Sequence, residues 1–139
     1  MGVKGFFRFR LILSALTGVF FLTSNATGAD MTESDKNWDK VFAKSDMVDV
    51  SKVSFKNRYG IELIGDLYLP KGKASEKLAA IAVSGPFGAV KEQASGLYAQ
   101  TMAERGFAAL AFDPSYTGES GGEPRLVASP DINTEDFSA

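Results

Sequence analysis

The sequence predicts an α/β fold in which an antiparallel hairpin precedes a parallel strand–helix–strand unit. Two hydrophobic patterns lead to this prediction. Residues 50–69 alternate between apolar and polar side chains on either side of a turn, which is typical of a hairpin. Two later apolar runs, residues 78–83 and 107–112, flank a helical pattern. Short uninterrupted apolar runs are typical of parallel strands covered on both faces.

The hairpin prediction depends on the alternation and on the turn. Val53 and Phe55 point to one side, and the turn sequence Asn57-Arg58-Tyr59-Gly60 follows, with Gly60 free to adopt a positive φ. Residues 61–69 then alternate with a period of two, so that one row is expected to be buried. That row is Ile61, Leu63, Gly65, Leu67 and Leu69, and the opposite row is Glu62, Ile64, Asp66 and Tyr68. The hairpin is expected to end at residues 70–73, Pro-Lys-Gly-Lys.

The strand–helix–strand unit is predicted from Leu78 to Phe112. The first strand, Leu78–Val83, ends at Ser84-Gly85, and the second, Phe107–Phe112, ends at Asp113-Pro114. A helix is predicted over residues 92–105, with Gly106 just beyond its end and with Glu92 and Arg105 placed favourably for the helix dipole. Its sheet-facing stripe is predicted to consist of Ala94, Leu97, Tyr98, Thr101 and Met102. The crossover is expected to be right-handed.

The segments on either side are mostly polar. Within residues 30–49, Trp38, Val41 and Phe42 have the spacing of one helical face, which predicts a short amphipathic helix packed on the domain. Residues 113–139 are rich in Gly, Pro, Ser and acidic side chains, and Asp131–Phe137 is predicted to begin a helix.

Residues 1–29 have the pattern of an export signal. Lys4, Arg8 and Arg10 precede the uncharged apolar run 11–22, which is shorter than the roughly 20 apolar residues of a membrane span. Small residues follow at 25–29, and we expect cleavage after Ala29, with cleavage after Gly28 as the alternative. The chain is therefore expected to be periplasmic or secreted, without a stable membrane span after cleavage; an uncleaved anchor is the other interpretation.

Composition excludes several kinds of chemistry. The sequence has no histidine and no cysteine, which excludes His-based triads, thiol nucleophiles, disulfides and zinc sites built from these residues. The formal net charge of −2 does not favour a nucleic-acid partner. No cofactor is expected, because Gly85 and Gly88 do not complete a dinucleotide fingerprint and Lys91 is not preceded by the glycine of a phosphate-binding loop. No metal site is predicted.

Two loops follow the predicted parallel strands, and ligands of open α/β sheets bind at such strand ends. The first loop, Ser84–Lys91, precedes a helix, where free backbone N–H groups favour an anion or a developing oxyanion. Pro86 has no N–H, so the Phe87 N–H is the candidate oxyanion-hole donor. A plain strand-to-helix connection is the alternative interpretation.

The second loop, 113–125, contains Gly118-Glu119-Ser120-Gly121-Gly122, which matches G-x-S-x-G as a string. A nucleophile elbow requires a sharp turn from strand directly into helix, whereas Asp113-Pro114 ends the strand well before Ser120. Ser120 is therefore not predicted to be a nucleophile. Asp113 is expected to hold the loop by accepting backbone N–H bonds. Arg125 is a candidate partner for Glu119, Glu123 or a substrate carboxylate, or else a solvated surface residue.

These segments together resemble a known family. The hairpin, the 78–83 strand, the SGPFGAVKEQ loop and the stretch LYAQTMAERGFAALAFDPSYTGESGGEPR resemble the N-terminal half of an α/β-hydrolase of the dienelactone hydrolase-like and X-Pro dipeptidyl-peptidase-like branch, over about residues 50–139. In that family the loop after the third strand provides one oxyanion-hole N–H. Gly85 stands where some relatives have His, Pro86 matches their Pro, and Phe87 matches the donor. The GESGG stretch matches a structural loop after the fourth strand.

The resemblance implies an incomplete hydrolase sheet. The family's nucleophile, acid and histidine would all lie beyond the end of this chain, so we expect no triad activity from it alone. The implied strand order is 1-2-4-3, which leaves Leu78–Val83 at an edge. The intact parent would hydrolyse an ester, lactone or peptide-like acyl bond of a small molecule. The alternative hypothesis is an exported, non-catalytic module that binds an anionic ligand through the Gly85–Lys91 loop.

Overall fold

The computed structural model describes residues 37–139, so the predicted export signal lies outside the described residues. The elements are β1 (Val48–Lys56), β2 (Glu62–Pro70), β3 (Ala80–Ser84), α1 (Ala94–Glu104), β4 (Ala108–Phe112) and α2 (Pro130–Asp136). The strands form one sheet in the order β1-β2-β4-β3. β1 and β2 are antiparallel, as are β2 and β4, whereas β3 and β4 are parallel. The predicted hairpin, parallel unit and strand order are confirmed.

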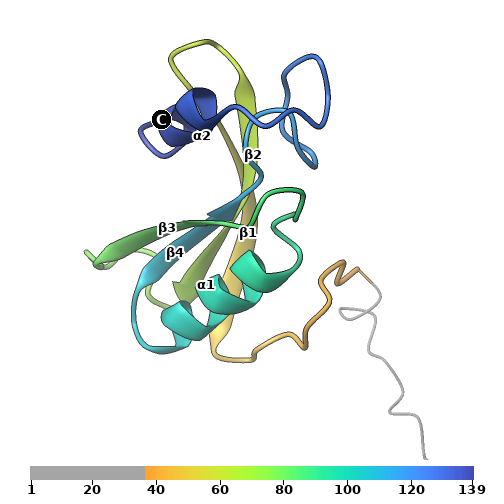
Figure 1. Ribbon diagram of the computed structural model, residues 1–139. Coiled ribbons are helices and arrows are strands. Elements are labelled where there is room, and N and C mark those ends of the chain that lie inside the picture. The colour runs from red at the N-terminus through yellow and green to blue at the C-terminus, as the bar shows by residue number, and fades with distance from the viewer. Residues whose placement is uncertain (1–36) are drawn as a thin grey trace, which may run out of the picture. The chain divides into compact units, whose positions relative to one another are not determined.

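Figure 1 shows how this order places the loops. α1 runs along one face of the sheet, while α2, the β1–β2 turn and the loop after β4 gather at one end. The turn has the predicted geometry, because Gly60 adopts φ +79°. The Asn57 side chain shapes it by accepting hydrogen bonds from the N–H groups of Tyr59 and Ile61, both at 3.0 Å.

The prediction of a single buried row on β2 is wrong. Asp66 and Tyr68, assigned to the solvent side, are buried, whereas Leu67 and Leu69 on the opposite row are only partly buried. The reason is tertiary: the row with Asp66 and Tyr68 faces α1 and the N-terminal segment. The core on this side consists of Val48, Tyr68, Ala99, Ala103, Ala109 and Ala111.

The face of α1 that packs on the sheet also differs from the predicted stripe. Leu97 and Tyr98 are about half exposed, and the buried residues are Ser95, Gly96, Ala99, Gln100 and Ala103. Small side chains allow the helix to approach the strands closely. The helix is shorter than predicted at both ends, so Glu92 precedes it and Arg105 is its C-cap residue. Gly106 follows with φ +98°, as expected for the residue after a helix.

Gly96 sets the distance between α1 and the sheet. A Cβ atom at this position would overlap the Lys91 carbonyl oxygen and would lie 3.0 Å from the Tyr68 Oη. The backbone oxygen cannot move aside cheaply, so only glycine fits here without a shift of the helix.

The short helix predicted from Trp38, Val41 and Phe42 is not present. Residues 37–47 form turns and bends, and Val41 is exposed. The predicted packing is nevertheless partly correct, since Trp38 and Phe42 contact the core with their rings in an edge-to-face arrangement. Hydrogen bonds to the rest of the fold, instead of helical hydrogen bonds, hold this segment. The Val41 N–H donates to the Glu92 carbonyl, and the Gln100 Nε2 donates to the Ala43 carbonyl.

The other sheet face carries a chain of aromatic rings. Phe55 packs against Phe112, and Phe112 packs against Phe137, with ring centroids 6.0 and 5.0 Å apart. The α2 helix that precedes Phe137 confirms the predicted helix near the C-terminus.

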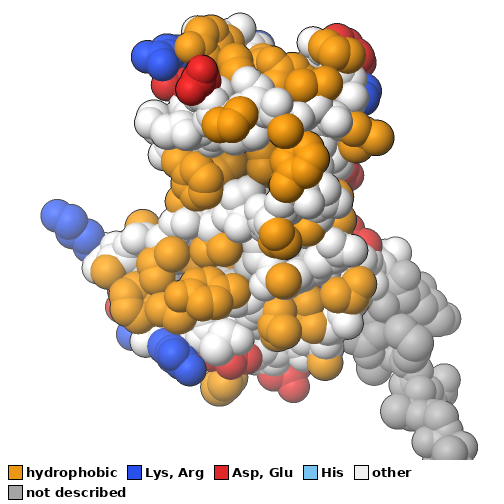
Figure 2. Space-filling view, in the orientation of Figure 1, with side chains coloured by type: hydrophobic (Ala, Val, Ile, Leu, Met, Phe, Trp, Pro, Cys, Tyr) orange, Lys and Arg blue, Asp and Glu red, His pale blue; other side chains and the backbone are white. Residues whose placement is uncertain are grey.

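β3 departs from its prediction because it is not covered on both faces. Ala80 and Ala82 are exposed, and Ile81 and Val83 are partly buried. Figure 2 shows hydrophobic side chains gathered at the surface beside α1 and the β3–β4 side of the sheet. Within residues 37–139, no helix combines the length and the apolar character needed to cross a bilayer.

Gly96→Ala is expected to destabilise the fold by about 1–3 kcal/mol, the range for overpacking a tightly packed site. Alanine is otherwise the better helix former, so a loss of stability would identify the close approach as the cause. The measurement is urea unfolding followed by circular dichroism. Leu97→Ala, at an exposed position of the same helix, is the control and should change stability little. Equal stability of Gly96→Ala and the wild type would contradict this explanation.

Candidate functional site

The candidate site is formed by the loops that follow β3 and β4. The two strands are parallel, so the loop after Ser84 and the loop after Phe112 start from the same end of the sheet, where both strands have their carboxyl ends. The first leads into α1, and the second contains the Gly118–Gly122 stretch. The structure therefore brings together the two loops singled out in the sequence.

Lys91 joins the two loops. Its side chain is fully buried, and its Nζ lies 2.5 Å from the Glu92 carboxylate, 3.1 Å from that of Asp113 and 2.6 Å from that of Glu119. Burial alone would lower the pKa of Lys91, but the hydrogen bonds to these three carboxylates outweigh it and raise the pKa. The ammonium group is therefore charged under all ordinary conditions.

Asp113 is the acceptor at the centre of this cluster. It is fully buried, and it accepts hydrogen bonds from the backbone N–H of Lys91 at 2.8 Å and of Glu119 at 3.0 Å. The prediction that Asp113 holds its loop through backbone N–H bonds is confirmed. Gly118 makes room for this carboxylate, because a Cβ there would overlap it and the residue adopts φ +53°.

Glu119 extends the cluster to the hairpin. Its carboxylate accepts hydrogen bonds from the Lys52 Nζ at 2.7 and 2.8 Å, in addition to the bond from Lys91. These bonds, first that from Lys52 and then that from Lys91, lower the pKa of Glu119 to about 2. Lys52 lies on β1, so one chain of charges connects the edge of the sheet to both loops.

The cluster already contains its own cation. Glu92, Asp113 and Glu119 present carboxylate oxygens within 4.8 Å of one another, a spacing that could hold a metal ion. The Lys91 ammonium contacts all three, so their charge is balanced from within the chain. The same contacts weaken the hypothesis of an anion bound by the Gly85–Lys91 loop, because both the N–H and the Nζ of Lys91 bind Asp113.

Ser120 is a structural hydroxyl. It is 1% exposed, its Oγ accepts a hydrogen bond from the Ile64 N–H at 2.9 Å, and it donates to the Asp113 carbonyl at 2.7 Å. These bonds agree with the sequence-based rejection of this residue as a nucleophile.

The acidic partners proposed for Arg125 are wrong. Its guanidinium donates to the carbonyl oxygens of Ser120, Gly118 and Gly122. Arg125 therefore closes the GESGG loop by capping its carbonyls. The planar guanidinium carries five N–H donors, so one side chain can satisfy several carbonyls of a loop.

Phe87 lies on the exposed part of the first loop. Its side chain is 69% exposed, and its backbone N–H has no acceptor among residues 37–139. The loop turns at Gly88, which adopts φ +83°, and the Ala89 N–H donates to the Pro86 carbonyl at 2.9 Å. The role of Phe87 as an oxyanion donor stays a prediction.

A second polar cluster was not predicted from the sequence. Asp136 is buried, and it accepts hydrogen bonds at 2.8 Å from the Ser115 N–H, the Ser115 Oγ and the Asn57 Nδ2. It fastens α2 to the loop after β4 and to the β1–β2 turn. Asp136 is 79 residues from Asn57 in the sequence, and no local pattern could pair them.

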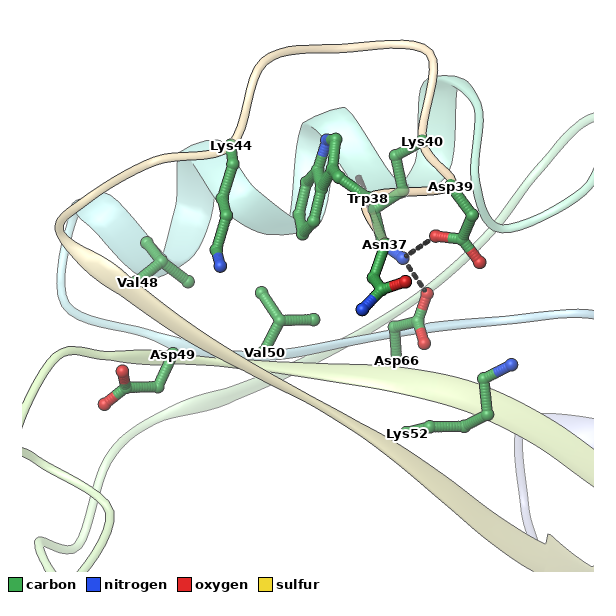
Figure 3. A pocket seen from close by; sticks show the side chains of 10 residues that line it. All are labelled: Asn37, Trp38, Asp39, Lys40, Lys44, Val48, Asp49, Val50, Lys52 and Asp66. Carbon is green, nitrogen blue, oxygen red and sulfur yellow. Dashed lines mark hydrogen bonds and ion pairs between the residues drawn. The ribbon is translucent and has the colours of Figure 1, made fainter. Parts of the chain in front are cut away.

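A pocket of about 590 Å³ lies apart from Phe87, between the N-terminal segment and β1 (Figure 3). The Lys40 Nζ bridges the carboxylates of Asp39 and Asp66 at 2.7 and 2.9 Å on one side of it. The pocket reaches the loop cluster only through Lys52. The lining residues are Asn37, Trp38, Asp39, Lys40, Lys44, Val48, Asp49, Val50, Lys52 and Asp66.

Sequence comparisons connect the chain to longer proteins. No protein-family model matches it. It is 66% identical over 118 residues to the uncharacterized protein PA2218 of Pseudomonas aeruginosa and 49% identical over 92 residues to the uncharacterized protein YcjY of Escherichia coli. It is 37% identical over 87 residues to the thiohydrolase aneE of Aspergillus aculeatus. The matches cover 84%, 64% and 63% of this chain but only 32%, 30% and 26% of those proteins, so the chain spans about a third of their length or less.

Solved structures agree with these matches. The crystal structure of PA2218 superposes with a TM-score of 0.71 at 71% identity, covering 75% of this chain and 32% of that one. The α/β-hydrolase GrgF from Penicillium sp. sh18 superposes with a TM-score of 0.56 at 30% identity, covering 65% of this chain and 30% of that one.

Lys91→Met is expected to destabilise the fold by about 3–5 kcal/mol, because it leaves the buried Asp113 carboxylate without its cation. Thermal or urea unfolding at pH 7 measures the change. The exposed pair of Lys73 and Glu76, at 3.2 Å, provides the control, and Lys73→Met should cost no more than about 1 kcal/mol. A Lys91→Met variant as stable as the control would show that the cluster does not hold the loops.

The Glu119 contribution is expected to depend on pH. A carboxyl group whose pKa falls on folding, here from 4.5 to about 2, stabilises the fold fully above the unfolded value and loses this contribution as the pH falls toward the folded value. Glu119→Gln should therefore lower the unfolding free energy at pH 7, and its difference from the wild type should shrink between pH 4.5 and 2. A difference that stays constant over this range would contradict the assignment, and Glu76→Gln serves as the control.

Proposed function

Because this chain carries the opening part of an α/β-hydrolase fold, we propose that it supplies the oxyanion-binding portion of an acyl hydrolase. The bond cleaved is an ester, thioester, lactone or peptide-like acyl bond of a small molecule. The Phe87 N–H is the donor that stabilises the oxyanion formed when a nucleophile attacks the acyl carbon. The nucleophile and its base belong to the intact hydrolase, since the Ser120 hydroxyl is held by hydrogen bonds within its loop and to β2.

One observation carries this proposal. An exposed loop follows a parallel strand, and its Phe87 N–H has no acceptor in the part of the chain that the structure describes. The far end of the loop is fixed at Lys91 by the buried Asp113 carboxylate. A donor of this kind is effective only when it is held in place before the charge develops. The name of the thiohydrolase relative supports the inclusion of thioesters among the substrates.

The anion-binding module is a weaker proposal for the same loop. It would need a positive centre facing the ligand, and Lys91 directs its charge into the protein. The Phe87 N–H is a neutral donor, which suits a transient oxyanion better than a permanently bound anion.

The test uses a chimera that joins residues 1–139 to the remaining two thirds of the PA2218 protein. The chimera is expected to hydrolyse members of a panel of p-nitrophenyl esters, thioesters and lactones, whereas the 139-residue chain alone should not exceed the buffer rate. Phe87→Pro removes the N–H and should lower kcat by about 10²–10³-fold. Phe87→Ala keeps the N–H and is the matched control. Equal rates for the two variants would contradict the role of Phe87, and a chimera inactive on the whole panel would contradict acyl hydrolysis.

Export is the second part of the proposal. The basic and apolar pattern of residues 1–22 supports a periplasmic or secreted location. Expression of the chain in a Gram-negative bacterium should give a periplasmic product whose N-terminal residue is Asp30, as read by mass spectrometry. A cytoplasmic product that retains residues 1–29 would contradict export.

A further inference from the structure

The pocket between the N-terminal segment and β1 is polar for its size. Its volume of about 590 Å³ lies within the range of small-molecule sites, which are lined mostly by apolar side chains. Here only Trp38, Val48 and Val50 are apolar, and the other lining residues are one asparagine, three lysines and three aspartates. The chemistry of this lining therefore favours a ligand that forms several hydrogen bonds.

The charges around the pocket balance one another. The Lys40 Nζ lies 2.7 Å from the Asp39 carboxylate and 2.9 Å from that of Asp66, and the Lys52 Nζ lies 2.7 Å from that of Glu119. The pocket therefore presents both signs of charge, already paired within the chain. An anion would meet the carboxylates and a cation would meet the ammonium groups, and like charges brought together at a binding site are costly.

The Trp38 ring is a further reason against a cationic ligand. The face of an indole attracts a cation within about 6 Å of its centroid. Lysines of the chain already lie there, with the Lys40 Nζ at 4.8 Å and the Lys44 Nζ at 5.9 Å. The indole N–H donates to the Phe42 carbonyl, which fixes the ring in place. What Trp38 offers a ligand is therefore mainly its carbon surface.

The pocket keeps unused capacity for neutral hydrogen bonds. The Asn37 side chain points into it near Val50 (Figure 3), and its amide has no hydrogen-bond partner among residues 37–139. An amide supplies two donor hydrogens and an acceptor oxygen. The Asp39 carboxylate is about half exposed, and its bond to Lys40 uses Oδ1. Hydroxyl groups both donate and accept, so they can use these sites without adding charge.

We propose that this pocket is a binding site for a neutral sugar ring. The hydroxyl groups of the sugar bond to the Asn37 amide and to the exposed oxygens of Asp39. Its C–H groups pack against Val50 and against the Trp38 ring, whose face carries partial negative charge. The pocket lies apart from Phe87, so this site does not depend on the acyl hydrolysis proposed above.

Saturation-transfer NMR on the full chain tests the ligand class. The probes are glucose and galactose, and maltose and cellobiose as linked pairs of rings. Phosphate, spermidine and leucine represent an anion, a cation and a zwitterion, and titration gives the affinity of each. Binding of a single or a linked ring, tighter than binding of the charged probes, is expected. No sugar binding, or tighter binding of a charged probe, would overturn the proposal.

Variants locate the bound sugar. Asn37→Ala removes an exposed amide and should weaken binding about tenfold, the loss for one or two hydrogen bonds. Val50→Phe fills the pocket and should abolish binding. Ser54→Ala, exposed on the same strand outside the pocket, is the matched control and should bind like the wild type. Circular dichroism checks that each variant is folded. Sugar binding that is equal in Asn37→Ala and Ser54→Ala would place the ligand elsewhere and overturn the proposal.

Discussion

The buried ammonium of Lys91 is the interaction on which the arrangement of the two loops depends. Three carboxylates converge on it, and the fully buried one, that of Asp113, would be costly to bury without a cation. Because Lys91 also donates its backbone N–H to Asp113, the end of the first loop and the start of the second are fixed by one residue pair. The open part of the first loop, including Phe87, is thereby anchored at a rigid point.

The fold around this cluster is held together by close approach more than by large side chains. α1 presents small residues to the sheet, with Gly96 against Tyr68 and the Lys91 carbonyl. Three further rings lie on the other face, where Phe112 contacts both Phe55 and Phe137. Hydrogen bonds of Asp136 and Arg125 hold the segments that have no regular structure. The same design covers about a third of two longer proteins, PA2218 and the α/β-hydrolase GrgF.

Local patterns predicted the strands and the turn at Gly60, because alternation, apolar runs and turn residues are properties of neighbouring residues. The strand order was implied by the family resemblance and is confirmed. The local patterns gave wrong predictions where tertiary contacts decide which side chains are buried. Leu97 and Tyr98 belong to the predicted stripe of α1 but are about half exposed, because the helix packs on the sheet through a face that includes the small residues Gly96, Ala99 and Ala103. The partners of Lys91 and Asp136 are far apart in the sequence, so pairing them requires the fold. Asp113 was predictable because its position directly after a buried strand limits what its carboxylate can do.

The N-terminal segment has a consequence for how the molecule can be observed. The chain contains a single tryptophan, and its Nε1 donates to the Phe42 carbonyl while its ring lies beside the pocket lined by Lys40 and Lys44. Its emission therefore originates from one place, the contact between this segment and the body of the fold. Detachment of the segment and unfolding of the sheet can thus be separated, by comparing tryptophan fluorescence with a signal from the backbone.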